Sequence, residues 1–182
     1  MSPMNRKARS APGRERSAPR IDYNPEGKWS VASVMARYAA LRVQLGGADD
    51  FALTPRVYTN SGGMTWTYNI MDGVADGVRR GDQACIELAI AYIEDNIMAS
   101  YTGYIRERMA RSLRHAPLSK SQQTRLANVF LSQLISGNLH KEYREYIRLF
   151  RTIGVADSRT IIEKQRVSAK AYIRRAAERL LA

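Results

Sequence analysis

The chain has 182 residues, 45% of them apolar and 25% charged, so it can bury the core of one compact domain and is not disordered throughout. Its single Cys excludes a disulfide framework and a Cys-based zinc site, and two His residues argue against a multi-His metal centre. Lys and Arg together number 29 against 17 Asp and Glu, a formal charge of +12. No apolar run approaches the roughly 20 residues of a membrane span. We expect no cofactor, no metal and no membrane span.

Residues 1–28 are predicted to form a disordered basic tail that precedes a single helical domain over residues 29–182. The tail holds four of the six prolines and almost no large apolar side chain, so it cannot bury enough surface to offset its ordering entropy. Seven bases against three acids give it a charge of +4. It lacks the apolar region of a secretory signal, and we expect a cytoplasmic or nucleoid-associated protein.

The first predicted helix runs from Ser30 to Leu45 and stops at a Gly-Gly pair. β-branched and aromatic residues at 56–59 and 64–68 flank the sequence Asn-Ser-Gly-Gly and predict a short hairpin. Tyr58, Trp66 and Tyr68 are interpreted as its packing side, or alternatively as a stacking surface for bases. A weak helix is expected over residues 69–80, because two glycines interrupt it.

Apolar residues at helical spacing fill the rest of the chain. They predict five helices with short connections: residues 83–99, 103–115, a third from a Ser119–Gln122 capping box to Gly137, 141–153, and a last one from 158 to the C-terminus. Because the connections are short, consecutive helices are expected to pack antiparallel to each other. The predicted fold class is therefore mostly α, either a helical bundle or a short stack of helical hairpins.

Basic residues are aligned along three of these predicted helices. The rows are Arg108, Arg111 and His115 at i, i+3 and i+7, Arg144, Arg148 and Arg151 at i, i+4 and i+7, and Arg166, Lys170 and Arg174 at i, i+4 and i+8. Like charges in a row repel, so each row needs either facing acids or a bound polyanion, and the planar fork of Arg suits phosphate oxygens. The candidate nucleic-acid-binding residues are Arg108, Arg111, Arg114, Arg144, Arg148, Arg151, Arg166, Lys170 and Arg174.

Two motif resemblances offer other interpretations. Residues 126–147 resemble a helix-turn-helix, but Val129, Phe130 and Leu131 occupy the place of its tight turn, which favours a continuous helix. Arg108 and His115 are similar in spacing to the Arg-x4-6-His motif of HEPN ribonucleases, which are small helical bundles. That resemblance implies a His that assists attack by a ribose hydroxyl and an Arg that stabilises phosphate charge. The family often has a polar residue directly after this Arg, whereas Met109 follows Arg108 here.

The remaining chemical side chains predict structural roles or a protein partner. Cys85 lies among apolar neighbours and is predicted to pack in the core. Glu87 and Glu94, at i and i+7, predict an exposed acidic face that could bind a basic partner or the chain's own tail. Tyr143 and Tyr146 are the anchors expected if the protein is an interaction adaptor.

The favoured hypothesis is a non-enzymatic protein that binds DNA or RNA through phosphates, using Arg-rich helix faces and a basic arm. The charge total, the three rows and the tail all support it. Weak sequence preference is expected, because no base-reading motif is present. The alternatives are a helical protein-protein adaptor and a HEPN-like ribonuclease.

Overall fold

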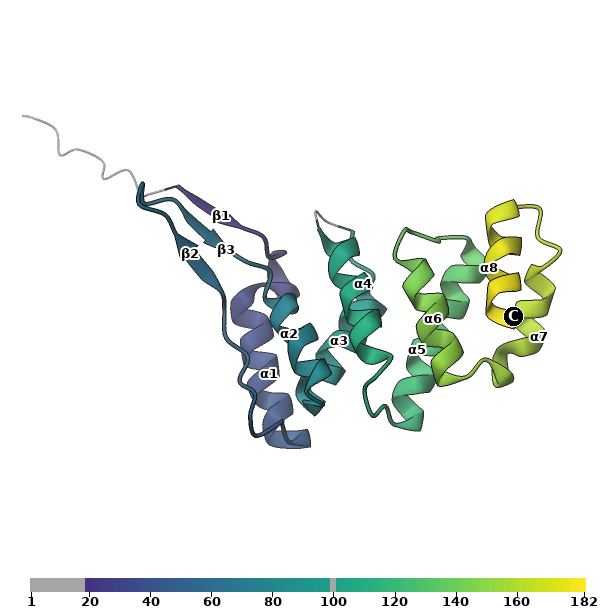
Figure 1. Cartoon of the computed structure of the whole chain (residues 1–182), viewed down its shortest axis with the longest axis horizontal. Helices are drawn as coiled ribbons and strands as arrows, with labels where there is room; N and C mark the ends of the chain where they lie inside the picture. The colour runs from purple at the N-terminus through teal and green to yellow at the C-terminus, as the bar shows by residue number, and fades with distance from the viewer. Residues whose placement is uncertain (1–18, 99–100) are drawn as a thin grey trace, which may run out of the picture.

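The computed structural model describes residues 19–98 and 101–182. These residues form a mostly α-helical protein, as the sequence predicts, with a small three-stranded sheet at the N-terminal end (Figure 1). The α-helices are α1 (Val31–Leu45), α2 (Ile70–Arg79), α3 (Gln83–Asp95), α4 (Thr102–Leu113), α5 (Lys120–Ser136), α6 (Tyr143–Ile153), α7 (Arg159–Gln165) and α8 (Ala171–Leu181). The strands are β1 (Arg20–Asp22), β2 (Val57–Thr59) and β3 (Thr65–Thr67).

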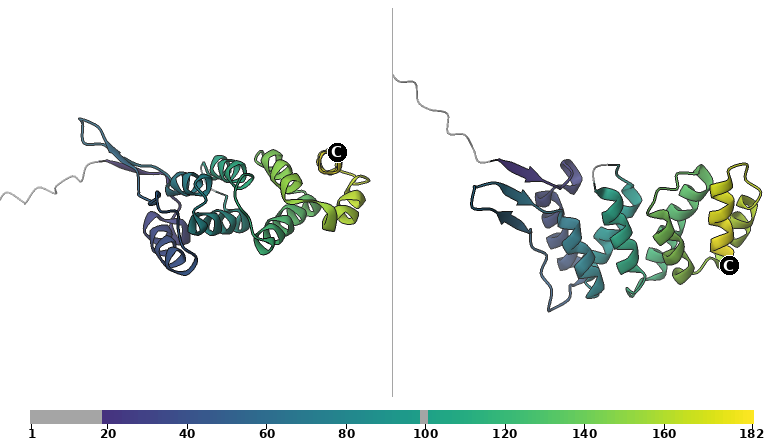
Figure 2. Two further views of the ribbon diagram at one scale, coloured as in Figure 1. Left: turned by 60° about the horizontal axis from the view of Figure 1, so that its bottom comes forward. Right: turned by 45° about the horizontal axis from the view of Figure 1, so that its top comes forward.

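The helices stack in two parallel layers along one long axis (Figures 1 and 2). Helices α1, α3, α5 and α7 pack in sequence to form layer A, and α2, α4, α6 and α8 form layer B. Each of the last three hairpins, α3–α4, α5–α6 and α7–α8, contributes one helix to each layer. Of the two architectures that the sequence left open, the chain therefore adopts the stack of helical hairpins.

The core lies between the two layers and is continuous along the stack. Helix α3 is buried most completely, since it packs on helices of both layers. Aromatic side chains fill the space further along, where the ring of Phe130 stacks on that of Tyr146 with centroids 4.7 Å apart. Cys85 is fully buried, which confirms the prediction of core packing, and burial raises the pKa of its thiol.

Local sequence signals explain where several helices begin and end. Ser30 and Asp82 cap α1 and α3 through their side chains. Helix α5 begins with the full capping box of Ser119 and Gln122 and ends at Gly137 in the left-handed conformation. It continues without a turn through residues 129–131, so the interpretation of this stretch as a continuous helix is confirmed.

The hairpin predicted around residues 56–68 is present, with β2 antiparallel to β3. A third strand that the sequence did not predict, β1, pairs in parallel with β3 on its other side. The expectation of disorder through residue 28 is therefore wrong for residues 19–28, because β1 and a short 3₁₀ helix (Gly27–Trp29) lie there. The earlier part of the predicted tail, residues 1–18, is outside the described residues.

The predicted last helix is in fact two helices, α7 and α8, separated by a turn at residues 166–170. A straight helix over residues 159–181 would extend about 35 Å, whereas α5 extends only about 25 Å. Folding back allows both Ile162 of α7 and Ile173 of α8 to be buried. The apolar periodicity continues through the turn, so the sequence pattern did not reveal it.

Candidate nucleic-acid interface

Four arginines line one groove between α6 and the end of α8. Arg144, Arg148 and Arg151 come from successive turns of α6, and Arg179 comes from α8. The groove has a volume of about 550 Å³ and includes Ile147. We call these four residues the arginine groove. Three of them were predicted from the sequence, and Arg179 was not, although Arg175 and Arg179 lie at i and i+4.

The amphipathic sequence of α6 fixes the direction of its three arginines. The opposite side of the helix carries Tyr146, Leu149 and Phe150, all of which are buried against the core. Because α6 presents this side to the core, Arg144, Arg148 and Arg151 are exposed. The same argument holds for α8, where Ile173, Ala177 and Leu180 are buried and Arg179 is exposed.

The arginine groove carries positive charge that the described residues balance only in part. Arg148 forms an ion pair with Glu145, one turn earlier on α6. Arg144, Arg151 and Arg179 form no ion pair with any acid in the described ranges. Both helices carry an excess of base, since each has three arginines and one glutamate. The groove therefore holds several guanidinium groups whose hydrogen-bond donors are available to an anion.

The predicted row on α4 is neutralised by acids of the protein itself. Arg108 Nη1 lies 2.5 Å from Asp72 Oδ1, and its Nη2 lies 2.7 Å from Asp76 Oδ1, so it joins α4 to α2. Arg111 pairs with Glu107 on its own helix. Arg114 approaches Glu145 of α6 at 4.0 Å. Each of these three arginines therefore has an acid of the protein beside it, and only Arg108 joins two helices, so their role as phosphate contacts stays a prediction.

Asp76 is the centre of this cluster of ion pairs. Its carboxylate accepts hydrogen bonds from Arg56, Arg79 and Arg108, with distances between 2.5 and 2.7 Å. Burial alone would raise the pKa of Asp76, but the charge of Arg108 and the bonds from Arg56 and Arg79 outweigh it and lower that pKa. Three cations on one carboxylate leave a small excess of positive charge at the junction of β2, α2 and α4.

The third predicted row does not exist as a helical line. Arg166 follows the end of α7, Lys170 is the residue before α8, and only Arg174 lies inside a helix. Arg174 Nη1 donates to the carbonyl oxygens of Ser168 and Ala169, at 2.7 and 3.1 Å, and so holds the turn between α7 and α8. The expected alignment was wrong because it assumed one continuous helix.

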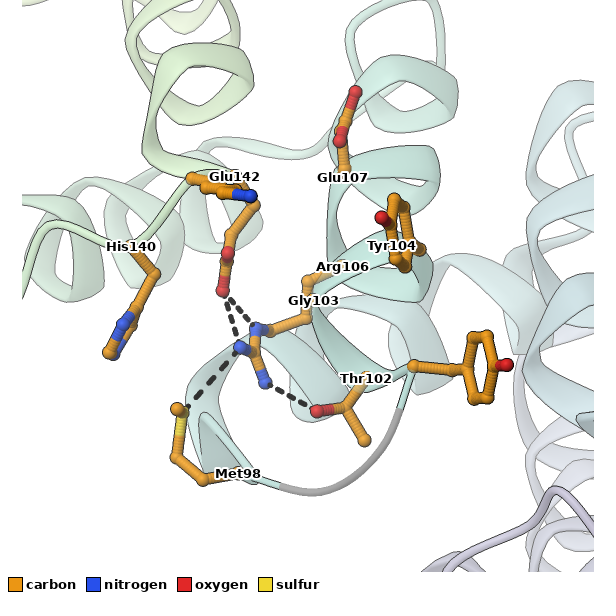
Figure 3. A pocket seen from close by; sticks show the side chains of 10 residues that line it. Met98, Thr102, Gly103, Tyr104, Arg106, Glu107, His140 and Glu142 are labelled. Atoms are coloured by element: carbon orange, nitrogen blue, oxygen red, sulfur yellow. Dashed lines mark hydrogen bonds and ion pairs between the residues drawn. The ribbon is translucent and has the colours of Figure 1, made fainter.

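A second cavity, of about 330 Å³, lies between the start of α4 and the loop before α6 (Figure 3). Its wall contains a buried ion pair, in which Arg106 of α4 binds the carboxylate of Glu142. The Nε atom of Arg106 lies 2.8 Å from Glu142 Oε1. His140 and Tyr104 lie on either side of this pair in Figure 3. No local pattern predicts this pair, since Arg106 and Glu142 are far apart in the chain.

Two further interpretations meet contrary geometry. Tyr143 and Tyr146, the expected adaptor anchors, are 3% and 1% exposed and cannot reach a partner. The acids Glu87 and Glu94 both accept from Arg125 of α5, at 2.7 Å in each case, so they are paired within layer A. These hydrogen bonds, first that with Glu94, raise the pKa of Arg125 despite its partial burial.

The two residues of the ribonuclease-like spacing face different environments. Arg108 binds Asp72 and Asp76 on α2, whereas His115 follows the end of α4 and is exposed. A phosphate at Arg108 would have to compete with two carboxylates. Within the described ranges no group of three or more His, Cys, Asp or Glu side chains could hold a metal ion, and no helix there has the length and apolarity to cross a bilayer.

Comparison with known proteins adds no assignment. No family model, no curated protein and no solved structure matches the chain.

Proposed function

We propose that the protein is a non-enzymatic nucleic-acid-binding protein that holds the phosphate backbone in the arginine groove. The observation that carries this proposal is the convergence of Arg144, Arg151 and Arg179 in one groove without an ion-pair partner in the described residues. Guanidinium groups bind phosphate oxygens through two parallel hydrogen bonds, and a row of them along one groove matches a repeating polyanion.

The two layers differ in a way that supports this surface. Layer B carries the groove, and the acids of α6 and α8 engage only part of its arginines. On layer A several bases face acids, as Arg125 does with Glu87 and Glu94, and Arg159 does with Glu163. A polyanion therefore finds its most favourable potential on the α6–α8 side of the stack.

The affinity would come mainly from phosphate contacts and the release of counterions. Binding should then weaken steeply as salt increases, with little dependence on sequence. Positive residues of the first 18 positions would add to this attraction without fixing a register.

The test measures binding of the full chain to labelled nucleic acid over a range of salt concentrations. The variant R144Q/R151Q/R179Q removes three charges from the groove, and K120Q/R159Q/K164Q removes three from layer A as a matched control. For duplex DNA the groove variant should flatten the slope of log Kobs against log salt by about 2 to 3. The control should stay close to the wild type.

Equal effects of the two variants would show that only net charge matters and would reject a site in the groove. Absence of salt-dependent binding to any nucleic acid would reject the function itself. A complex with a protein that survives high salt, together with no binding of nucleic acid, would then favour the adaptor.

A further inference from the structure

A pocket of about 380 Å³ next to the start of α4 is walled by four tyrosines. Tyr23 follows β1, Tyr68 follows β3, and Tyr101 and Tyr104 lie at the start of α4. We call these four residues the tyrosine pocket. Tyr68, Tyr101 and Tyr104 are 46%, 58% and 72% exposed. Their rings thus present apolar faces to solvent, which is costly unless something covers them.

The backbone around the tyrosine pocket is held in place by the side-chain amides of a buried and a half-buried asparagine. Asn69 Nδ2 donates to the carbonyl of Tyr23 at 3.1 Å, and Asn24 Nδ2 donates to the carbonyl of Tyr68 at 3.0 Å. Asn69 also caps α2. Tyr23 and Tyr68 are therefore fixed beside the first turn of α2, and the pocket is preformed on that side.

The other side of the pocket contains a strained residue. Tyr101 has a φ of +64°, a left-handed conformation that costs a bulky residue roughly 1 kcal/mol or more. Its ring packs edge-on against Tyr23, with centroids 5.7 Å apart. The strained backbone places the ring of Tyr101 against Tyr23 and not within the first turn of α4. Such strain is common where a side chain is positioned for binding.

The polar edge of the pocket carries little net charge. Asp72 and Arg108 both line it, and they bind each other. A charged ligand would have to break this ion pair. A flat neutral ring with polar edges could instead stack on the tyrosines and donate a hydrogen bond to Oδ2 of Asp72, the carboxylate oxygen that Arg108 does not contact. A nucleobase has this combination of a π-face and an edge of donors and acceptors.

A neighbouring cavity extends from the tyrosine pocket towards α6, the helix that carries most of the arginine groove. Tyr101 and Tyr104 line the neighbouring cavity as well, together with Lys141, which lies one turn before Arg144. A strand could leave the tyrosine pocket past Lys141 and continue along Arg144, Arg148 and Arg151. Bases are free to stack on side chains only in an unpaired strand, because a duplex hides their faces.

From this arrangement we propose that the nucleic acid bound by this protein is single-stranded, with one base held in the tyrosine pocket and the following phosphates in the arginine groove. The inference rests on the proposed function and narrows its substrate class. It assigns Tyr101 and Tyr104 to base stacking, and Lys141 to the phosphate between the two sites.

The experiment compares three labelled probes on the full chain at one salt concentration. They are an oligothymidylate, a duplex of the same length, and an abasic strand with the same phosphates. The oligothymidylate should bind most tightly, and removal of its bases should weaken it by about 5- to 100-fold. Y104A and Y101N should each weaken the oligothymidylate within that range and leave the abasic strand unchanged. Asn is chosen at 101 because it tolerates a positive φ.

Two controls separate stacking from folding. Y104F keeps the ring and should retain wild-type binding within about twofold. Y58A removes a tyrosine of similar exposure from β2, outside the pocket, and should have no effect. The inference is overturned if the duplex and the single strand bind equally, or if the Y104A and Y101N variants bind the oligothymidylate as the wild type does. Those results would leave the arginine groove intact, whereas failure of every probe to bind would overturn the proposed function as well.

Discussion

The guanidinium of Arg106 and the carboxylate of Glu142 form an ion pair that is almost entirely buried, with side chains 2% and 5% exposed. The pair joins α4 to the residue that precedes α6, and Arg106 also donates to the carbonyl of Ile97. It therefore connects the second hairpin of the stack to the third. Each charge depends on the other, because both are almost entirely removed from bulk water.

We expect Arg106→Met to destabilise the protein by about 3–5 kcal/mol, since it leaves a buried carboxylate without a partner. Urea unfolding at neutral pH measures this loss. The double variant R106M/E142L should recover most of it, because it removes both charges. Arg159→Gln, at an exposed pair, should change stability by no more than about 0.5 kcal/mol. Equal stability of R106M and the wild type would contradict the structural role.

Asp76 makes a pH-dependent contribution to the stability of the folded protein. Its pKa in the folded protein lies below the ordinary value, so the stabilisation is fully present above pH of about 4 and is lost as the pH falls through the folded pKa. Asp76→Asn should cost about 1–2 kcal/mol at pH 7 and progressively less under acid conditions. Unfolding of both proteins at several pH values tests this, and Asp49→Asn, at an exposed acid, is the control.

The N-terminus of α5 depends on one hydroxyl. Ser119 accepts from the backbone N–H of Gln122, and the Gln122 side chain accepts from the N–H of Ser119. Replacing Ser119 by Ala should lower the free energy of unfolding by about 1 kcal/mol. Ser121→Ala, two residues further along and exposed, should have almost no effect. If both substitutions cost the same, the cap does not stabilise the helix.

Gly77 is required by packing and not by its backbone conformation. A Cβ at this position would lie 2.4 Å from Cys85 Sγ and 2.6 Å from Phe51 Cε1. Gly77→Ala should therefore cost about 1–3 kcal/mol, although Ala favours a helix. Gly73→Ala in the same helix meets only the end of the Leu53 side chain and should cost clearly less. Thermal unfolding of the two variants compares them, and the reverse order would contradict this packing.

Much of the fold follows from local signals in the sequence. The capping residues Ser30 and Ser119 and the stop at Gly137 all lie where the sequence places them. Such signals are reliable because a cap is satisfied by residues three or four positions away. The turn within the last predicted helix has no such local signal, since Ile162 and Ile173 keep the same periodicity on both sides of it.

The candidate site was less predictable, because charge pairing is a long-range property. Arg108 and Arg144 look alike in the sequence, each within a basic row. Only packing shows that Arg108 meets Asp72 and Asp76 across α2, while Arg144 faces an open groove. The tyrosine pocket is likewise assembled from residues that are widely separated along the chain.

By itself, the sequence determined the helical class, most helix boundaries and the excess of positive charge. These follow from periodicity, capping and composition, which act over a few residues or over the whole chain at once. Tertiary structure decided which arginines are neutralised, which converge on the α6–α8 groove and which tyrosines share a pocket. Those outcomes depend on how the two layers are stacked, and the free energy of a charge depends on what lies within a few ångströms of it in space.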